Sequence, residues 1–272
     1  MDKIKVKDLE VFARHGAFPE ENVLGQKFLV SVTMYMDTRE AGMTDNLTKS
    51  IHYGEVSHFI KKFMEENVFK LIETVAEKLA RELLIAFPLM EKLDLEIKKP
   101  WAPIGLPLEM VSVEISRGWH LAYLGMGSSL GDKKQYLDGA VRALQETEGC
   151  EVLKVADYLA TEPYGGAAKE EFLNSCMVLR TLFTPRELLE RLHEIEQEAN
   201  RERLVHWGDR TLDLDILMYD DLVMDSAELT IPHVEMHLRS FVLDPLSQIA
   251  PYKKHPVLQK TVMQLRSELE ND

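Results

Sequence analysis

An alternating run of apolar residues at positions 211–218 constrains this chain more than any other feature. Leu212, Leu214 and Ile216 alternate with Thr211, Asp213 and Asp215. A period of two is typical of a β-strand with one buried face. Asp213 and Asp215 therefore point to the same side of that strand. Two like charges at that distance repel, so a strand that only completed a core would not favour them.

A divalent cation would turn this repulsion into attraction. Mg²⁺ takes a few carboxylate oxygens and completes its octahedron with waters and phosphates. Arg210 comes just before the acid pair, and Arg201 and Arg203 come shortly before Arg210. Guanidinium groups suit the charge of a polyphosphate. The acid pair alone leaves open a solvated strand face, but the three arginines with Trp207 favour a metal–phosphate site.

Composition limits the classes of partner. The net charge of −14 argues against nucleic-acid binding, which needs a basic face. An anionic substrate must then be attracted by local cations or by a metal. Cys150 and Cys176 have no ligand-like spacing, and we expect reduced thiols in the cytoplasm. The N-terminus lacks an apolar signal segment and no apolar run is long enough to span a bilayer, so we expect no membrane partner.

The length of 272 residues predicts two domains. In the first half, residues 3–13 read as a strand whose one-residue slip after Val6 indicates a β-bulge. A loop at 14–22, a strand at 28–36, helical spacing over 56–86 and two further strands near 93–97 and 111–115 follow. This order predicts an α+β domain. The junction at Arg117–His120 gives domains of 1–118 and 119–272.

The second half begins again with a strand at 121–128. We expect a helix at 133–146, strands near 152–158 and 172–182, a second helix and the alternating strand. Thr184, Pro185 and Glu187 have the spacing of an N-cap, a first helical residue and a capping-box partner. The order strand–helix–strand–strand–helix–strand fits a ferredoxin-like sheet.

Residues 120–260 resemble the 6-hydroxymethyl-7,8-dihydropterin pyrophosphokinases of folate synthesis. The motifs that carry this resemblance, in the order of the family, are Gly127-Ser128-Ser129-Leu130-Gly131, Thr161-Glu162-Pro163, Phe172-Leu173-Asn174, Arg201-Glu202-Arg203, Trp207-Gly208-Asp209-Arg210-Thr211-Leu212-Asp213-Leu214-Asp215 and Pro232-His233. The resemblance implies that Asp213 and Asp215 hold two Mg²⁺ ions with ATP. It also implies that Arg201 and Arg203 act on the transferring pyrophosphoryl group.

The same resemblance implies the remaining binding residues. Asn174 would hydrogen-bond the pterin, Phe172 and Phe241 would stack on it, and Thr161 and Pro163 would lie beside it. The nucleotide site would comprise Glu196, Trp207, Arg210, Ile216, Thr230, His233 and Arg239. Two alternatives stay open: Phe172 and Phe241 could simply pack in the core, and His233 could be only a turn residue. Ser129 departs from the asparagine that is common in the family, Asp209 from proline and Leu204 from a basic residue.

Residues 3–117 resemble dihydroneopterin aldolase. The motifs are His15-Gly16-Ala17, Glu21-Asn22, Gly25-Gln26, Thr44-Asp45-Asn46, His52-Tyr53-Gly54-Glu55, Leu71-Ile72-Glu73 and Lys99-Pro100. The resemblance implies the tunnelling fold, with a four-stranded antiparallel sheet and two helices. It also implies a homo-oligomer that forms through this domain, with sites between subunits.

The aldolase resemblance assigns roles that the residues alone do not. Lys99 would be the general base and acid through water, with Tyr53 as proton-transfer partner and Glu21 nearby. Glu73, with Ile72, would bind the pterin, and the site would need no metal or other cofactor. A lysine can act as a base where burial or a neighbouring cation lowers its pKa. Without the resemblance, simpler interpretations stay open. Lys99 could be an exposed lysine at a strand end, Glu73 a polar helix residue and Tyr53 a half-buried residue in a turn.

The two resemblances predict a bifunctional folate enzyme that cleaves dihydroneopterin and then pyrophosphorylates the product with Mg²⁺ and ATP. Two alternatives stay open. In one, only the kinase is active and the first half is an oligomerisation scaffold. In the other, the chain is a non-catalytic sensor that binds Mg²⁺–ATP.

Overall fold

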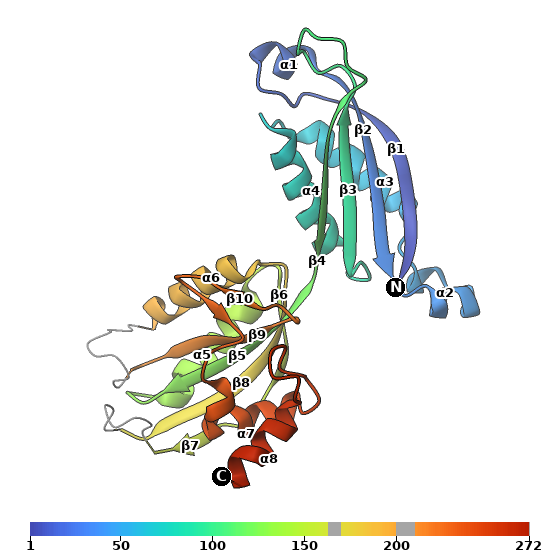
Figure 1. The fold of residues 1–272 in the computed structure, drawn as a ribbon. Helices are drawn as coiled ribbons and strands as arrows, with labels where there is room; N and C mark the ends of the chain where they lie inside the picture. The colour runs from blue at the N-terminus through green and yellow to red at the C-terminus, as the bar shows by residue number, and fades with distance from the viewer. Residues whose placement is uncertain (163–169, 200–209, 272) are drawn as a thin grey trace. The chain divides into compact units, whose positions relative to one another are not determined.

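The computed structural model describes residues 1–162, 170–199 and 210–271. The chain divides into two compact units, Met1–Trp119 and His120–Asp272, each considered by itself below (Figure 1). Four residues with an expected role, Pro163, Arg201, Arg203 and Trp207, lie outside the described residues.

The first unit is an antiparallel sheet covered by two long helices. Its strands are β1 (Asp2–Ala13), β2 (Gln26–Met36), β3 (Lys92–Lys99) and β4 (Val111–Gly118), in the order β1-β2-β3-β4. The helices α3 (Tyr53–Glu66) and α4 (Ile72–Ala86) come between β2 and β3. Helix α3 packs against β1, and α4 packs against β3 and β4 (Figure 1). The predicted α+β architecture is confirmed.

Local sequence explains the details of this unit. The register of β1 against β2 shifts between Val6 and Leu9, which confirms the predicted bulge. Within the expected loop at 14–22 the structure has a short helix instead, α1 (Pro19–Leu24). Proline in the first turn, followed by two glutamates, favours a helix start there. Two further short helices are α2 (Arg39–Thr44) and η1 (Leu47–Lys49).

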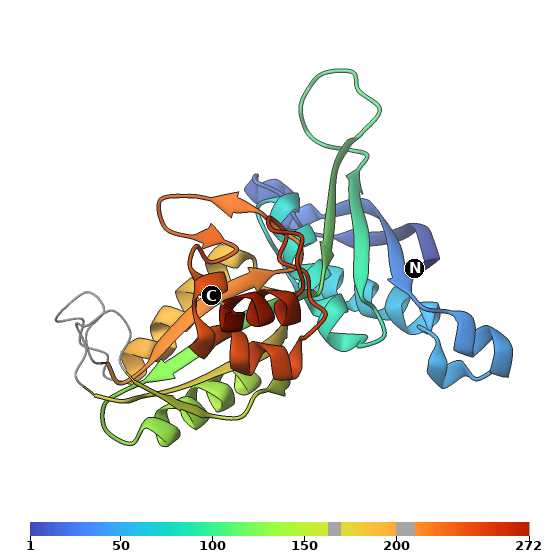
Figure 2. The same cartoon turned by 60° about the horizontal axis from the view of Figure 1, so that its bottom comes forward.

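The core of the first unit lies between the sheet and the two helices. Alternate residues of the strands point into it, and the apolar faces of α3 and α4 close it. The largest fully buried side chains include Phe28, Met34, Leu93, Leu95 and Ile97 of the sheet and Ile60, Met64, Leu79 and Leu83 of the helices. A long loop joins β3 to β4 and extends from the end of the sheet (Figure 2).

The second unit has helices on both faces of a sheet. The strands β5 (His120–Ser128), β6 (Cys150–Val155), β8 (Phe172–Thr181) and β9 (Asp213–Tyr219) lie in the order β6-β8-β5-β9, all antiparallel. Helices α5 (Lys133–Glu146) and α6 (Pro185–Glu198) pack on one face. Helices α7 (Ser240–Ile249) and α8 (Val262–Asn271) pack on the other, where they contact each other (Figure 2). The predicted ferredoxin-like order is confirmed.

Smaller elements complete this unit. β7 (Leu159–Thr161) pairs with β8, while β10 (Met224–Asp225) and β11 (Thr230–Ile231) form a separate hairpin that is followed by η2 (Met236–Leu238). The capping box of Thr184 and Glu187 on α6 is confirmed. The strand expected at 152–158 is β6, which begins and ends earlier. Helices α7 and α8 were not expected, because α7 is short and has Pro245 inside it.

Two expectations concern the chain as a whole. Among the helices of the described residues, none combines the length and apolarity that crossing a bilayer requires. Cys150 and Cys176 are buried and neither is in a disulfide, which fits the expected reduced thiols. A cytoplasmic location stays a prediction.

Candidate active sites

A buried ion pair joins Lys99 to Glu21 in the first unit. Lys99 is the last residue of β3 and is 8% exposed, so it is not an exposed strand-end lysine. Its Nζ lies 2.5 Å from Oε1 of Glu21 on α1. Gln26 donates a hydrogen bond to the same oxygen at 2.9 Å, and the backbone N–H of Phe18 donates to Oε2 at 3.1 Å. Burial opposes ionisation of Glu21, but the hydrogen bond and the charge of Lys99, together with the hydrogen bonds from Phe18 and Gln26, outweigh it. The pKa of the Glu21 carboxyl therefore lies below the ordinary value.

His15 lies fully buried next to this pair. Its Nδ1 accepts a hydrogen bond from the backbone N–H of Phe69 at 3.2 Å, and its ring stacks on that of Phe69 with the centroids 5.8 Å apart. Burial lowers the pKa of His15 to about 4, and the Lys99 cation adds to this effect, while the Met64 carbonyl partly offsets it. The imidazole is therefore neutral. His15 and Gln26 stood in the sequence motifs without a role, and the structure gives both a position at this site.

Acidification should destabilise the first unit through His15. The pKa is 6.5 in the unfolded chain and about 4 in the fold, so the unfolded state binds more protons between these values. The stability that neutral His15 contributes is complete above pH 6.5 and is lost as the pH falls toward 4, by up to about 3 kcal/mol. The measurement is the urea midpoint of the first unit at pH values from 7.5 to 4.5. A His15→Asn variant should show a flatter dependence, and an equal dependence in both proteins would contradict this origin.

The other three residues expected at this site, Ile72, Glu73 and Tyr53, do not all lie at the same end of the helix pair. The segment between α3 and α4 contacts the loop before α1, because the N–H of Gly16 donates to the carbonyl of Phe69 at 3.0 Å. Ile72 and Glu73 open α4 directly after that segment, so they lie at the same end as Lys99. Tyr53 opens α3, which has 14 residues, and so lies about 20 Å away along the helix at 1.5 Å per residue. Tyr53 therefore cannot reach Lys99 of the same chain.

In the second unit, two glycines of β5 lie beside the acid pair. In the register of β5 and β9, Asp213 is opposite Gly127 and Asp215 is opposite Gly125. On the other side of β5, Gly127 is opposite Asn174 of β8. Asn174, Gly127 and Asp213 therefore form one row across three strands. Adjacent strands lie about 4.8 Å apart, which puts the backbones of Asn174 and Asp213 about 10 Å apart, and the glycine between them has no side chain.

The absence of a side chain at Gly127, next to Asn174, leads to a test. A Cβ at this position would lie 3.0 Å from Oδ1 of Asn174 and 3.8 Å from the ring of Phe172. Gly127→Ala should therefore weaken pterin binding by about tenfold or more, because the amide has to move, and leave Mg²⁺–ATP binding nearly unchanged. Titration with each ligand separately measures this. Gly139→Ala on α5 is the matched control, since its Cβ would meet nothing within 4 Å, and equal pterin affinities in the two variants would contradict the expectation.

Cations gather around Asp213. Nη1 of Arg210 lies 2.7 Å from Oδ1 of Asp213. Burial lowers the pKa of His233, the charge of Arg239 lowers it further, and the charges of Glu235 and Asp213 partly offset this. Arg210 therefore contacts Asp213, and the charges of Arg239 and Asp213 both act on His233.

The residues expected to bind the pterin lie along β8 and β7. Nδ2 of Asn174 donates a hydrogen bond to Oγ1 of Thr161 at 2.8 Å, and Thr161 is opposite Phe172 in the strand register. Asn174 is 7% exposed, so its amide is held in place. Phe241, in the first turn of α7, lies under the guanidinium of Arg239 with 5.6 Å from Cζ to the ring centroid.

Family models describe both units. Residues 4–116 match the model for dihydroneopterin aldolase, and residues 123–251 match that for 7,8-dihydro-6-hydroxymethylpterin-pyrophosphokinase. A pyrophosphokinase from Synechocystis is 40% identical over 146 residues, which are 54% of this chain and 74% of the relative. The chain belongs to the pyrophosphokinase family, with a dihydroneopterin aldolase domain in front. The aldolase match contains the Lys99–Glu21 pair, and the kinase match contains Asn174 and the acid pair.

Several relatives match almost the whole chain, across both domains. A folic acid synthesis protein from Dictyostelium discoideum is 28% identical over 298 residues, which are 100% of this chain and 45% of the relative. The chain thus spans less than half of that relative's length. The structure of E. coli dihydroneopterin aldolase in complex with neopterin is 28% identical and covers 43% of this chain and 100% of its own, with a TM-score of 0.41.

Three residues of the expected nucleotide site have other contacts in the kinase domain. The side chain of Ile216 packs in the core under α5 and α6, on the opposite face of β9. The hydroxyl of Thr230 donates to Asp225 at 2.7 Å within the β10–β11 hairpin. Glu196 is 3% exposed, and its Oε1 accepts a hydrogen bond from the backbone N–H of Leu214 at 2.8 Å. Glu196 therefore holds the strand between the two aspartates.

The donor set of the kinase domain fits Mg²⁺ better than a metal that needs a full protein cage. Within residues 1–162, 170–199 and 210–271, no group of three or more His, Cys, Asp or Glu side chains is arranged to hold a metal. Two carboxylates on one face of a strand, beside open space, are what Mg²⁺ needs when phosphates and waters supply its other ligands.

Proposed function

We propose that this chain catalyses two consecutive steps of folate synthesis, the cleavage of 7,8-dihydroneopterin and the pyrophosphorylation of its product. The observation that carries the proposal is that one chain holds two separate sites of matching chemistry. The first unit holds the buried Lys99–Glu21 pair. The second holds the row of Asn174, Gly127 and Asp213. The pterin that leaves the first site is the substrate that the second site fits.

At the aldolase site, Lys99 would act through a water molecule. The hydroxyl on the second carbon of the side chain loses a proton, and the bond between the first two side-chain carbons breaks to release glycolaldehyde. The electron pair enters the pterin ring, and a proton returned to the first carbon gives the hydroxymethyl group. Glu21 keeps the Lys99 side chain in place, and Gln26 holds Glu21. Glu73 would accept two hydrogen bonds from the pterin amide and amino groups, and no metal or other cofactor is proposed here.

The aldolase site also needs a second copy of the chain. Tyr53 and Lys99 lie at opposite ends of the helix pair, so the Tyr53 that meets a given Lys99 would come from a neighbouring subunit. We therefore propose a homo-oligomer that forms through the first unit. This arrangement supports sites between subunits, as the resemblance implies.

Mixing two inactive variants tests the shared site. Tyr53→Phe and Lys99→Ala should each lack most of the aldolase activity. After unfolding and refolding together in equal amounts, random assembly gives about a quarter of the sites an intact residue from each parent. Glycolaldehyde release should then rise to about a quarter of the wild-type rate. Simple mixing without refolding is the control, and a co-refolded sample that stays inactive would argue against the shared site.

At the kinase site, the hydroxymethyl oxygen would attack the β-phosphorus of ATP in line with the leaving AMP. Asp213 and Asp215 would hold two Mg²⁺ ions, which when bound neutralise charge on the phosphate oxygens. Asn174 and Thr161, with Phe172 and Phe241, would hold the pterin. Arg210, His233 and Arg239 would face the triphosphate, and Arg201 and Arg203 would contact the transferring group.

Product analysis by mass spectrometry tests the whole proposal. With dihydroneopterin, ATP and Mg²⁺ together we expect glycolaldehyde, AMP and the pterin diphosphate. Without ATP only glycolaldehyde and the hydroxymethyl pterin should appear. If no cleavage occurs but AMP forms when the hydroxymethyl pterin is supplied directly, the result would support the kinase with a scaffold. Tight ATP binding without AMP, even with the hydroxymethyl pterin supplied, would support the sensor. Omitting Mg²⁺ should stop only the second step.

A further inference from the structure

The residue after β5, Ser129, forms a two-way clasp with the backbone of Arg210. Ser129 is 2% exposed. Its Oγ accepts a hydrogen bond from the backbone N–H of Arg210 at 2.9 Å. In return, the backbone N–H of Ser129 donates to the carbonyl of Arg210 at 2.9 Å, and the N–H of Leu130 donates to the same carbonyl at 3.2 Å. The amide and the carbonyl of Arg210 are therefore both held by this short segment.

This clasp lies at the acid pair. Arg210 precedes Asp213 by three residues, and its guanidinium contacts the Asp213 carboxylate at 2.7 Å. A side chain reaches a target reproducibly only when its Cα is fixed. The hydroxyl of Ser129 is the side-chain group that fixes the Arg210 amide, and a serine is short enough to do so without blocking the space above Gly127.

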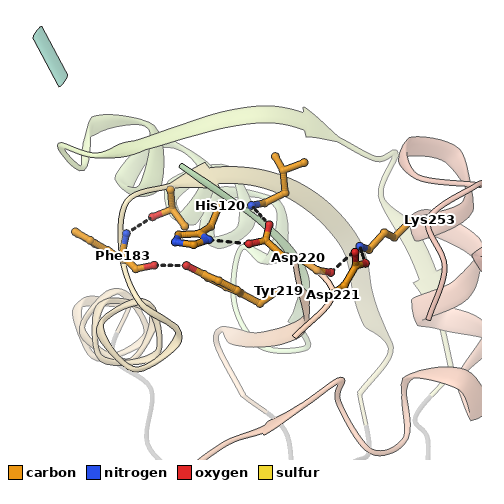
Figure 3. A network of polar contacts seen from close by, with 8 residues as sticks. His120, Phe183, Tyr219, Asp220, Asp221 and Lys253 are labelled. Carbon is orange, nitrogen blue, oxygen red and sulfur yellow. Dashed lines mark hydrogen bonds and ion pairs between the residues drawn. The ribbon is translucent and has the colours of Figure 1, made fainter. Parts of the chain in front are cut away.

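The rest of β9 is held by other groups. Glu196 binds the backbone N–H of Leu214 in the middle of the acid pair. At the far end, Asp220 contacts His120 and accepts from the N–H of Leu121, at 2.7 and 2.8 Å, while Lys253 donates to the carbonyl of Asp220 (Figure 3). The Ser129 clasp holds Arg210, which lies before the near end of the strand.

We propose that Ser129 is a positioning residue of the pyrophosphokinase site, which holds the Arg210 backbone so that the guanidinium can exchange Asp213 for a phosphate of ATP. This inference rests on the proposed kinase function. When a metal takes the oxygens of Asp213, the ion pair to Arg210 has to open. A fixed backbone lets the released guanidinium turn toward the triphosphate, which accepts paired N–H donors well.

The test compares Ser129→Ala with Ser129→Thr in the full chain. Ser129→Ala leaves the buried Arg210 amide without its acceptor, and the KM for Mg²⁺–ATP should rise about tenfold while the KM for the pterin stays within twofold. Ser129→Thr keeps the hydroxyl and should stay close to wild type. In an Arg210→Ala background, Ser129→Ala should add almost nothing, since a residue that acts through Arg210 has no further effect once Arg210 is gone.

Calorimetric binding of a non-hydrolysable ATP analogue with Mg²⁺ provides a readout that does not need turnover. Full additivity with Arg210→Ala, equal losses of pterin and nucleotide affinity, or wild-type behaviour of Ser129→Ala would each overturn the proposal. If the wild-type chain forms no AMP, the proposed reaction is refuted. If Ser129→Ala nevertheless lowers the affinity for the ATP analogue, and adds nothing in the Arg210→Ala background, the role of Ser129 is upheld. Thermal unfolding of each variant identifies one that fails to fold. If Ser129→Ala does not fold, Ser129→Cys replaces it in the same comparisons, because a thiol is a weaker acceptor than a hydroxyl.

Discussion

Asp213→Asn and Asp215→Asn are each expected to lower the rate of pyrophosphoryl transfer by about 10³-fold or more. Asparagine keeps the shape of the side chain and removes the charge that would bind Mg²⁺ in the proposed site. Metal neutralisation of the phosphate oxygens is worth several kcal/mol in the transition state, and each 1.36 kcal/mol corresponds to about a tenfold change in rate. Formation of AMP at saturating ATP and a series of Mg²⁺ concentrations measures the effect.

The two variants also separate the metal from the ion pair. Asp213 contacts Arg210, so Asp213→Asn removes both a metal ligand and the partner of a guanidinium. Asp215→Asn leaves that contact in place. Pterin binding should persist in both variants, because Asn174 and Thr161 make their own hydrogen bond, and cleavage of dihydroneopterin in the first unit serves as an internal control. Loss of pterin binding together with turnover would indicate misfolding or a wrong role.

Lys99→Ala should abolish aldolase activity and destabilise the first unit together. Removing a general acid–base typically lowers a rate by 10²–10⁴-fold. The change also leaves the Glu21 carboxylate buried without its cation, and breaking a buried pair in this way costs about 3–5 kcal/mol. Release of glycolaldehyde and the urea midpoint of the first unit measure the two effects. Activity at the wild-type rate would show that the assignment is wrong.

A double variant distinguishes the lost catalyst from the lost stability. Lys99→Met with Glu21→Gln removes both charges and keeps most of the buried volume, so the urea midpoint should recover most of the way toward wild type. The aldolase rate should not recover, because no base remains. Kinase activity should be normal in both variants. If cleavage returned together with stability, Lys99 would be a structural residue only.

The order of strands and helices in both units could be predicted from local sequence. The alternation in β9, the slip after Val6 and the capping box at Thr184 are all confirmed, because each depends on residues a few positions apart. The helices α1 and α7 were missed because local sequence alone does not indicate them. Their first residues resemble a turn or follow one, and contacts with distant segments stabilise them. Glu21 of α1 pairs with Lys99 of β3, and α7 packs against β8.

The residues of the kinase site could be listed from motifs, but their arrangement could not. The row of Asn174, Gly127 and Asp213 joins three strands that are far apart in the chain. Strand register decides which of the expected nucleotide residues face the acids, and it places Ile216 on the other side. The clasp between Ser129 and Arg210 spans 81 positions, so no local pattern could indicate it.

By itself, the sequence determined the periodicity of each element, the division into two units and the pair of acids on one strand face. These properties follow from neighbouring side chains and from the geometry of a single strand or helix. Only the tertiary structure decided that Lys99 is buried against Glu21, that His15 is neutral and that Tyr53 lies too far from Lys99 to serve it within one chain. Burial and distance depend on which distant segments pack together, and that information exists only when the whole unit has folded.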